Sequence, residues 1–245
     1  MNETHKSTFA SSAAVMAAPA VMAAPVAASG AVETSAPVAA PVAMTTPVSA
    51  PTVMTAPAKE WANPTAAGLV ALSVACICFF ALLTGRVGVS AMPLIGSWLL
   101  GGFIIQFIVG LADLRSGNTA GGNTFLFFSA FFMFVSGLEM LLKYTAIMND
   151  APLDGHLDGY VWAALTVVLW LWTPAFCTKF SMLSIVILFL DIALPFVALT
   201  DLGVLDKSFA HVSGWSMLAS GLVAIYLCSA MVINATYKRK VYPVF

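Results

Sequence analysis

Charged residues are scarce in this chain of 245 residues, and their scarcity excludes several classes of protein. Asp, Glu, Lys and Arg make up 9% of the sequence, whereas a soluble globular domain carries about 25%. The formal net charge of −1 provides no concentrated basic face, so nucleic acid is not an expected partner. Hydrophobic residues make up 60% of the chain, a composition suited to lipid.

Cysteine is rare as well, and Cys76, Cys78, Cys177 and Cys228 all lie in apolar segments. Cys76 and Cys78 are two residues apart, so on a helix they point to nearly opposite sides and cannot chelate one ion. The sequence therefore has neither a disulfide framework nor a zinc signature. We expect these cysteines to be small buried apolar residues.

The sequence also lacks a phosphate-binding loop, a nucleophile elbow and a cluster of transition-metal ligands. Asp150, Asp154, His156 and Asp158 are residue types that bind hard metals, but they have no recognised spacing, which favours a solvated acidic loop. We therefore expect no metal, no cofactor and no enzymatic activity. A membrane metalloenzyme that uses this loop is an alternative, and it predicts bound metal after purification.

The first part of the chain is a low-complexity segment rich in Ala, Pro, Val and Met. Prolines recur from Pro19 to Pro57 and interrupt any helix before it could span a bilayer. The segment lacks the charged start and continuous apolar core of a signal peptide, and it is poor in arginine for a transit peptide. We predict a disordered tail over residues 1–59 and a transmembrane domain over residues 60–245.

Six apolar runs of membrane-spanning length follow the tail. They cover residues 66–84, 93–112, 123–144, 160–178, 180–200 and 213–236. Asn63 is expected to cap the first helix at Pro64. Because the connections are short, we predict an all-α integral membrane protein whose six helices form one antiparallel bundle.

The basic residues predict the orientation of the bundle, because cytoplasmic loops are enriched in Lys and Arg. With both termini in the cytoplasm, the cytoplasmic side holds Lys59, Arg115, Lys179, Lys238, Arg239 and Lys240. The other side holds Arg86, Lys143 and Lys207 among several acidic residues. A plasma membrane location with both termini cytoplasmic is therefore expected.

The second apolar run ends in a stretch with little side-chain bulk. Gly102, Gln106 and Gly110 recur every fourth residue and share one helical face, so another backbone can approach closely. An amide inside a membrane helix is unfavourable unless it is paired, so Gln106 should face other helices or a wet path. The following turn, Gly117-Asn118-Thr119, has a charge pair, Asp113 and Arg115, ahead of it. We interpret the stretch as the wall of a pathway and its hinge.

Two acidic residues within the apolar runs are candidates for proton coupling. Asp191 lies near the middle of the fifth run, and Pro195 should free the Asp191 carbonyl from its helical hydrogen bond. A carboxylic acid that only ties helices together is the alternative reading of Asp191. Glu139 precedes Lys143 by four residues, which favours a local ion pair, although it could border a pathway with Phe128 and Phe132.

Several motifs together resemble those of one known family. Asn63-Pro64-Thr65-Ala66-Ala67-Gly68-Leu69 is similar to the opening signature of the acetate uptake transporter family, the bacterial succinate–acetate permeases and their fungal relatives. The resemblance continues through Gly101-Gly102, Gln106, Gly110 and Gly117-Asn118-Thr119, and it returns at Gly214-Trp215, Ala224-Ile225-Tyr226-Leu227, Asn234 and Pro243. It covers roughly residues 60–245.

The resemblance implies a six-helix protomer with its own pore, assembled as a homo-oligomer, usually a hexamer, that moves acetate and related short carboxylates with protons. It places an apolar constriction at Leu72, Phe128 and Leu190. Leu72 stands where the family has phenylalanine, and Phe128 replaces a tyrosine, which removes a hydroxyl that could bind a carboxylate. Our candidate pathway residues are Asn63, Leu72, Gln106, Asn118, Phe128, Leu190 and Tyr226.

Two other functions stay open at this stage. The protein could be a channel for another small solute, such as ammonia or a different weak acid. It could instead be a membrane scaffold or sensor that binds a partner through its tail. Competition against labelled acetate separates the first alternative from acetate transport, and deletion of residues 7–58 separates the second.

Overall fold

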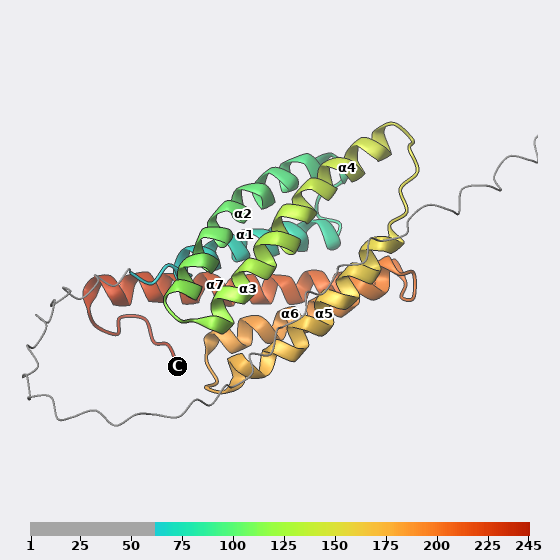
Figure 1. Ribbon diagram of the computed structural model, residues 1–245. Helices are drawn as coiled ribbons and strands as arrows, with labels where there is room; N and C mark the ends of the chain where they lie inside the picture. Colours follow the sequence, from blue (N-terminus) through green and yellow to red (C-terminus); the bar gives the residue numbers. More distant parts are fainter. Residues whose placement is uncertain (1–61) are drawn as a thin grey trace, which may run out of the picture. The chain divides into compact units, whose positions relative to one another are not determined.

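The computed structural model describes residues 62–245, which are entirely helices and connecting turns without a strand (Figure 1). The predicted tail, residues 1–59, lies outside the described residues. In chain order the elements are α1 (Thr65–Leu83), η1 (Val89–Ala91), α2 (Met92–Arg115), α3 (Thr119–Phe127), η2 (Phe128–Val135), α4 (Ser136–Met148), α5 (His156–Cys177), α6 (Met182–Asp201), η3 (Lys207–Phe209) and α7 (Ala210–Tyr237).

Six helical stretches among residues 62–245 are long and apolar enough to cross a membrane. Three are the single helices α1, α5 and α6. The other three are composite: Val89–Arg115, Thr119–Met148 and Lys207–Tyr237. The six-helix membrane fold predicted from the apolar runs is therefore confirmed.

The six spans form a ring. α1 packs along both α7 and α2, α7 packs along α6, and α6 packs along α5. On the other side, α2 packs along the third span, which consists of α3, η2 and α4. The third span meets α5 through aromatic contacts that close the ring, since the ring centroids of Phe127 and Trp172 are 6.0 Å apart and those of Phe132 and Trp162 are 6.1 Å apart.

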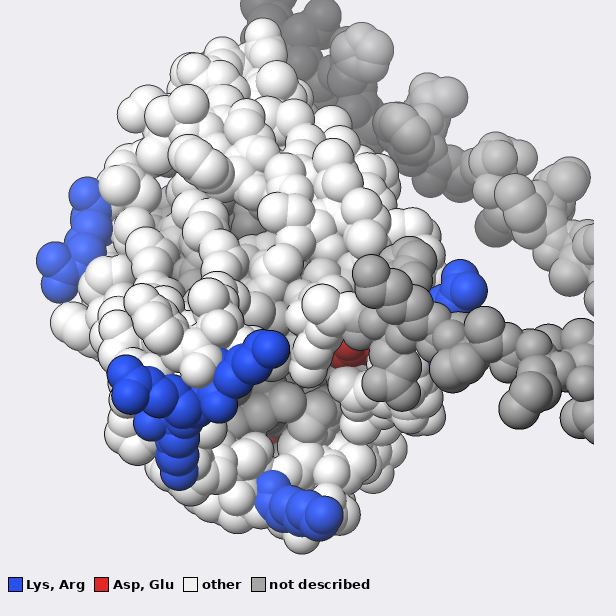
Figure 2. Space-filling model, turned by 90° about the vertical axis from the view of Figure 1, so that its left-hand side faces the viewer, with Lys and Arg blue, Asp and Glu red and all other residues white. Residues whose placement is uncertain are grey.

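The bundle has two distinct ends. We call the end with residues 62–64, 116–118, 178–181 and 238–245 the terminal end, and the end with residues 84–88, 149–155 and 202–206 the loop end (Figure 1). Arg115, Lys179, Lys238, Arg239 and Lys240 belong to the terminal end. Figure 2 views this end and shows Lys and Arg side chains around its edge, with little acidic surface visible.

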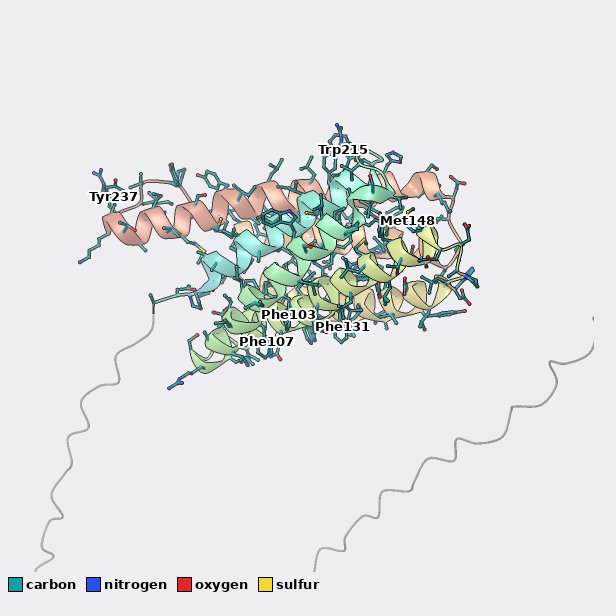
Figure 3. All side chains as sticks on the ribbon, turned by 90° about the horizontal axis from the view of Figure 1, so that it is seen from above. Phe103, Phe107, Phe131, Met148, Trp215 and Tyr237 are labelled. Carbon is teal, nitrogen blue, oxygen red and sulfur yellow. The ribbon has the colours of Figure 1, made fainter. Side chains whose placement is uncertain are left out.

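Large apolar side chains cover the outside of the bundle. Phe107 and Phe131 are 43% and 42% exposed on one side, and Trp215 is 53% exposed on the opposite side (Figure 3). Water would make such exposure unfavourable, whereas lipid tails accept it. The exposed surface therefore agrees with a bundle surrounded by a membrane.

The start of α1 differs by one residue from the prediction. The helix begins at Thr65, with Pro64 at the N-cap position. The Asn63 side-chain oxygen nevertheless accepts a hydrogen bond from the Thr65 N–H at 2.9 Å. Asn63 thus satisfies one of the free amides at the helix start, which is the role expected from its position.

The apolar run alone predicted one regular α-helix for the third span, but the span is irregular. Its middle section, η2, is a π-helix, and the Ser136 hydroxyl donates to the Phe131 carbonyl five residues earlier at 3.2 Å. A π-helical section changes the rotation of the residues that follow it, and such sections are frequent at functional sites. Here it sets the direction in which α4 presents its charged side chains.

Candidate functional site

A cavity of about 220 Å³ lies in the loop-end half of the bundle, and all six spans contribute to its lining. The lining residues are Phe79, Leu82 and Leu83 of α1, Met92 of α2, Phe132, Ser136, Glu139, Met140 and Lys143 of the third span, Trp162 of α5, Leu194, Val197 and Asp201 of α6, and Met217 of α7. The cavity is therefore central to the bundle and not a groove between two neighbouring helices.

Aromatic and aliphatic side chains form most of the cavity wall. Phe132 is 1% exposed, and its ring centroid lies 4.9 Å from that of Phe79 and 6.1 Å from that of Trp162. These contacts join α1, the third span and α5 around the cavity. Such a wall suits the alkyl part of a small ligand and disfavours hydrated ions.

The charged part of the lining centres on Lys143. Its Nζ lies 2.5 Å from Asp158 Oδ2 and 3.4 Å from Glu139 Oε2, and Asp201 is within electrostatic reach of it. We call Glu139, Lys143, Asp158 and Asp201 the Lys143 cluster. The side chains of Lys143, Glu139 and Asp158 are 34%, 25% and 16% exposed, so the cluster is accessible from the loop end.

The predicted ion pair between Glu139 and Lys143 is thus confirmed. The sequence did not predict that Asp158 and Asp201 lie near the same ammonium group. Asp158 was assigned to a solvated loop, but it belongs to the first turn of α5 and contacts Lys143. Asp154, at the exposed loop, instead pairs with His156, whose side-chain and backbone hydrogen bonds lower the pKa of the Asp154 carboxyl. No group of three His, Cys, Asp or Glu side chains in residues 62–245 could hold a metal ion.

The three predicted constriction residues lie in the core, further toward the terminal end than the cavity. Leu72, Phe128 and Leu190 are 4%, 2% and 0% exposed. Leu72 precedes the lining residue Phe79 by two helical turns. Phe128 and Leu190 precede the lining residues Phe132 and Leu194 by one turn each. The constriction stays a prediction, and its three members lie in an apolar, closely packed section of the bundle.

Gln106 faces other helices, as the sequence indicated. It is 0% exposed, and its Nε2 donates to the Gly68 carbonyl of α1 at 3.2 Å. On the same face, a methyl group added to Gly102 would meet Met133, and one added to Gly110 would meet the Gly122 carbonyl. The face therefore packs between α1 and the third span, and Gln106 is not among the cavity-lining residues. Its role in a pathway stays a prediction.

A buried polar cluster at the terminal end joins three spans. Asp113 of α2 is 2% exposed and accepts hydrogen bonds from Asn118 Nδ2 at 3.0 Å and from the Thr65 hydroxyl at 3.3 Å. Asn118 also caps α3 by accepting from the Gly121 N–H at 3.0 Å. The sequence had indicated Asp113 only as part of a charge pair, and Thr65 lies 48 residues away from it in the chain.

We predict that Asp113→Ala destabilises the protein by roughly 2 kcal/mol, because the buried Thr65 hydroxyl and the Asn118 amide lose their shared acceptor. Asp113→Asn keeps one acceptor oxygen and should cost less. Unfolding of the purified protein in detergent measures both, with Asp150→Asn, at the other end of the bundle, as the matched control. Equal stability of Asp113→Ala and the unmodified protein would contradict the importance of these hydrogen bonds.

Asp191 faces α5 and not the cavity. Its Oδ2 accepts a hydrogen bond from the Thr173 hydroxyl at 2.7 Å, and its carbonyl accepts one from the Trp170 indole at 3.0 Å. The expectation of a free carbonyl is therefore wrong: Pro195 removes the helical donor, and a tryptophan of the neighbouring span replaces it. Whether Asp191 couples protons stays a prediction.

Tyr226 lies within α7 and is not among the cavity-lining residues. Its hydroxyl donates to the Pro243 carbonyl at 2.9 Å. Asn234 holds the same C-terminal stretch by accepting from the Val241 and Tyr242 N–H groups at 2.7 and 2.9 Å. Both residues therefore fix the C-terminal segment against α7, and a place for Tyr226 in the substrate pathway stays a prediction.

These features define a helical membrane protein with six spans and a central cavity. The model of the GPR1/FUN34/yaaH family matches residues 46–245, and the chain belongs to this family. The resemblance inferred from the sequence motifs is thus confirmed.

Individual relatives agree with this assignment. The succinate-acetate/proton symporter SatP of Escherichia coli K12 is 27% identical over 187 residues, covering 75% of this chain and 95% of SatP. An uncharacterized protein of Methanothermobacter thermautotrophicus is 25% identical over 190 residues, covering 74% and 90% of the two chains. The solved structure of the bacterial acetate channel SatP matches with a TM-score of 0.66 at 24% identity, covering 76% of this chain and 100% of that one. This structural likeness shows the shared fold.

Proposed function

We propose that the chain conducts acetate and related short-chain carboxylates across the membrane. The observation that carries the proposal is the central cavity, which all six spans line and which combines an apolar wall with one ammonium group, Lys143, next to the carboxyl groups of Glu139 and Asp201. An ammonium group binds a carboxylate, and the wall accommodates a short alkyl group. The family membership and the names of the SatP relatives support the same substrate class.

The proposed pathway runs along the bundle axis. Substrate enters the cavity at the loop end and passes the constriction of Leu72, Phe128 and Leu190, which resists hydrated ions. At the terminal end, the Asn63 amide N–H and the start of α1 would offer polar groups to the carboxylate. Asn118 would act there only after releasing Asp113 and the Gly121 N–H, to which it is bonded. Local movement of the packed constriction would accompany each passage.

We further propose that both termini are cytoplasmic, in the plasma membrane, and that the protein is a homo-oligomer. The excess of Lys and Arg at the terminal end supports this orientation (Figure 2). The loop end, with the Lys143 cluster, would then face outward. The hexamer implied by the family resemblance is the expected assembly.

Uptake of labelled acetate into liposomes that contain the full purified chain tests the proposed function. We expect uptake well above that of protein-free liposomes, and an excess of propionate should compete with it while ammonium should not. Competition by ammonium alone would favour the other-solute channel. If deletion of residues 7–58 abolished a cellular role and left the flux unchanged, the scaffold alternative would gain support.

The same assay assigns proton coupling to one of the two acidic candidates. Glu139 borders the cavity, whereas Asp191 is bonded to Thr173. We therefore predict that Glu139→Gln removes the acceleration of acetate uptake by an inward proton gradient, and that Asp191→Asn retains it. The reverse pattern would assign the coupling to Asp191.

A further inference from the structure

The Lys143 cluster holds more negative than positive charge. Three carboxylates, of Glu139, Asp158 and Asp201, surround one ammonium group, so ionised side chains leave two negative charges uncompensated. We propose that this cluster makes the pathway selective for monocarboxylates over dicarboxylates, an inference that rests on the carboxylate transport proposed above.

The single ammonium group is largely occupied. Lys143 is the one cation among the residues that line the cavity, and two of its three N–H donors have partners in Asp158 and Glu139. A monocarboxylate needs only the remaining donor. The second carboxylate of a dicarboxylate would lie among acidic side chains without a cation, where like charges repel it.

The lining supplied by α1, α2 and α7 offers the second carboxylate no polar partner, and the other donors of the wall, the Ser136 hydroxyl and the Trp162 indole, are neutral and cannot compensate a second negative charge. α1, α2 and α7 contribute only Phe79, Leu82, Leu83, Met92 and Met217 to the described cavity wall. Burying an ionised carboxylate against such side chains without a hydrogen bond is strongly unfavourable. Repulsion by the acidic side chains and desolvation at the apolar wall therefore both disfavour a dicarboxylate in the cavity.

Three other loop-end side chains that can carry positive charge, those of Arg86, His156 and His211, have partners outside the cavity. The Arg86 guanidinium lies over the rings of Phe80 and Trp215, at 4.9 and 5.6 Å from their centroids. His156 is held by Asp154, and His211 Nδ1 lies 3.0 Å from the Ser208 carbonyl. The charged residues of the cavity lining, Glu139, Lys143 and Asp201, all belong to the Lys143 cluster.

Parallel uptake of labelled acetate and labelled succinate at neutral pH tests the inference. We expect the unmodified protein to take up acetate at least about tenfold faster than succinate, and Asp201→Asn to raise the succinate-to-acetate ratio several-fold. Asp201→Lys, which supplies a second ammonium group, should raise the ratio by about tenfold or more. Neither variant removes a partner from the two Lys143 ion pairs. The Escherichia coli relative is named for both substrates, so this selectivity would distinguish the chain from it.

Asp150→Asn is the matched control, because it removes the same charge from the loop end outside the cavity lining and should leave the ratio unchanged. The ratio is measured on one vesicle preparation, so it does not depend on how much protein is folded. Equal uptake of the two acids by the unmodified protein, or no rise of the succinate-to-acetate ratio in either Asp201 variant, would overturn the inference. The proposed function would still be supported in that case, provided that acetate is taken up. Absence of acetate uptake would contradict both.

Discussion

Replacing Ser136 by tryptophan is expected to reduce acetate uptake at least about tenfold, since conduction through a narrow path depends on its free diameter. Ser136 lines the cavity and is 2% exposed, and its small side chain takes up little of the cavity volume. An indole at this position would occupy a large part of a volume of about 220 Å³. Uptake of labelled acetate into liposomes measures the effect, and Ser136→Met should give an intermediate rate.

Ser97→Trp provides the matched control. Ser97 is exposed on α2 next to Trp98, which is 63% exposed, so an added indole there points away from the bundle and should leave uptake unchanged. Thermal unfolding of each purified variant shows whether it is folded. A Ser136→Trp protein with unchanged unfolding and unchanged acetate uptake would remove the cavity from the pathway.

The membrane fold could be predicted from the sequence because its determinants are local. Each span is an apolar run of sufficient length, and short polar connections require neighbouring helices to be antiparallel. The π-helix η2 could not be predicted, since residues 124–138 are apolar on nearly every side and give no helical periodicity. Its register depends on packing against α2 and on the Ser136 hydrogen bond to Phe131.

Contacts of the candidate site could be predicted only where the two interacting residues are close in sequence. The pair of Glu139 and Lys143 follows from a spacing of four residues on a helix. Asp158 and Asp201 join it from two other spans, so their positions depend on helix packing that a single sequence does not encode locally. The contact between Asp113 and Thr65 was missed for the same reason.

The close contact between α2 and α4 is expected to be the most sensitive packing point of the bundle. A methyl group added to Gly96 would lie 2.8 Å from the Gly137 carbonyl oxygen, and one added to Gly137 would lie 3.2 Å from the Gly96 carbonyl oxygen. The two backbones thus touch, as is typical where small residues face each other between membrane helices. An outward movement of α4 would displace Glu139 and Lys143, the charged side chains that it presents to the cavity.

We therefore predict that Gly96→Leu destabilises the protein by about 3 kcal/mol, which corresponds to a fall of roughly 10 °C in unfolding temperature. Gly101→Leu introduces the same side chain into α2 at an exposed position with no atom within 4 Å, so it should be neutral or slightly stabilising. Thermal unfolding in detergent compares the two variants. Because Gly96→Leu must push α4 outward, acetate uptake by this variant should also fall. Equal stability of Gly96→Leu and Gly101→Leu would instead show that α2 and α4 are not in backbone contact in the membrane protein.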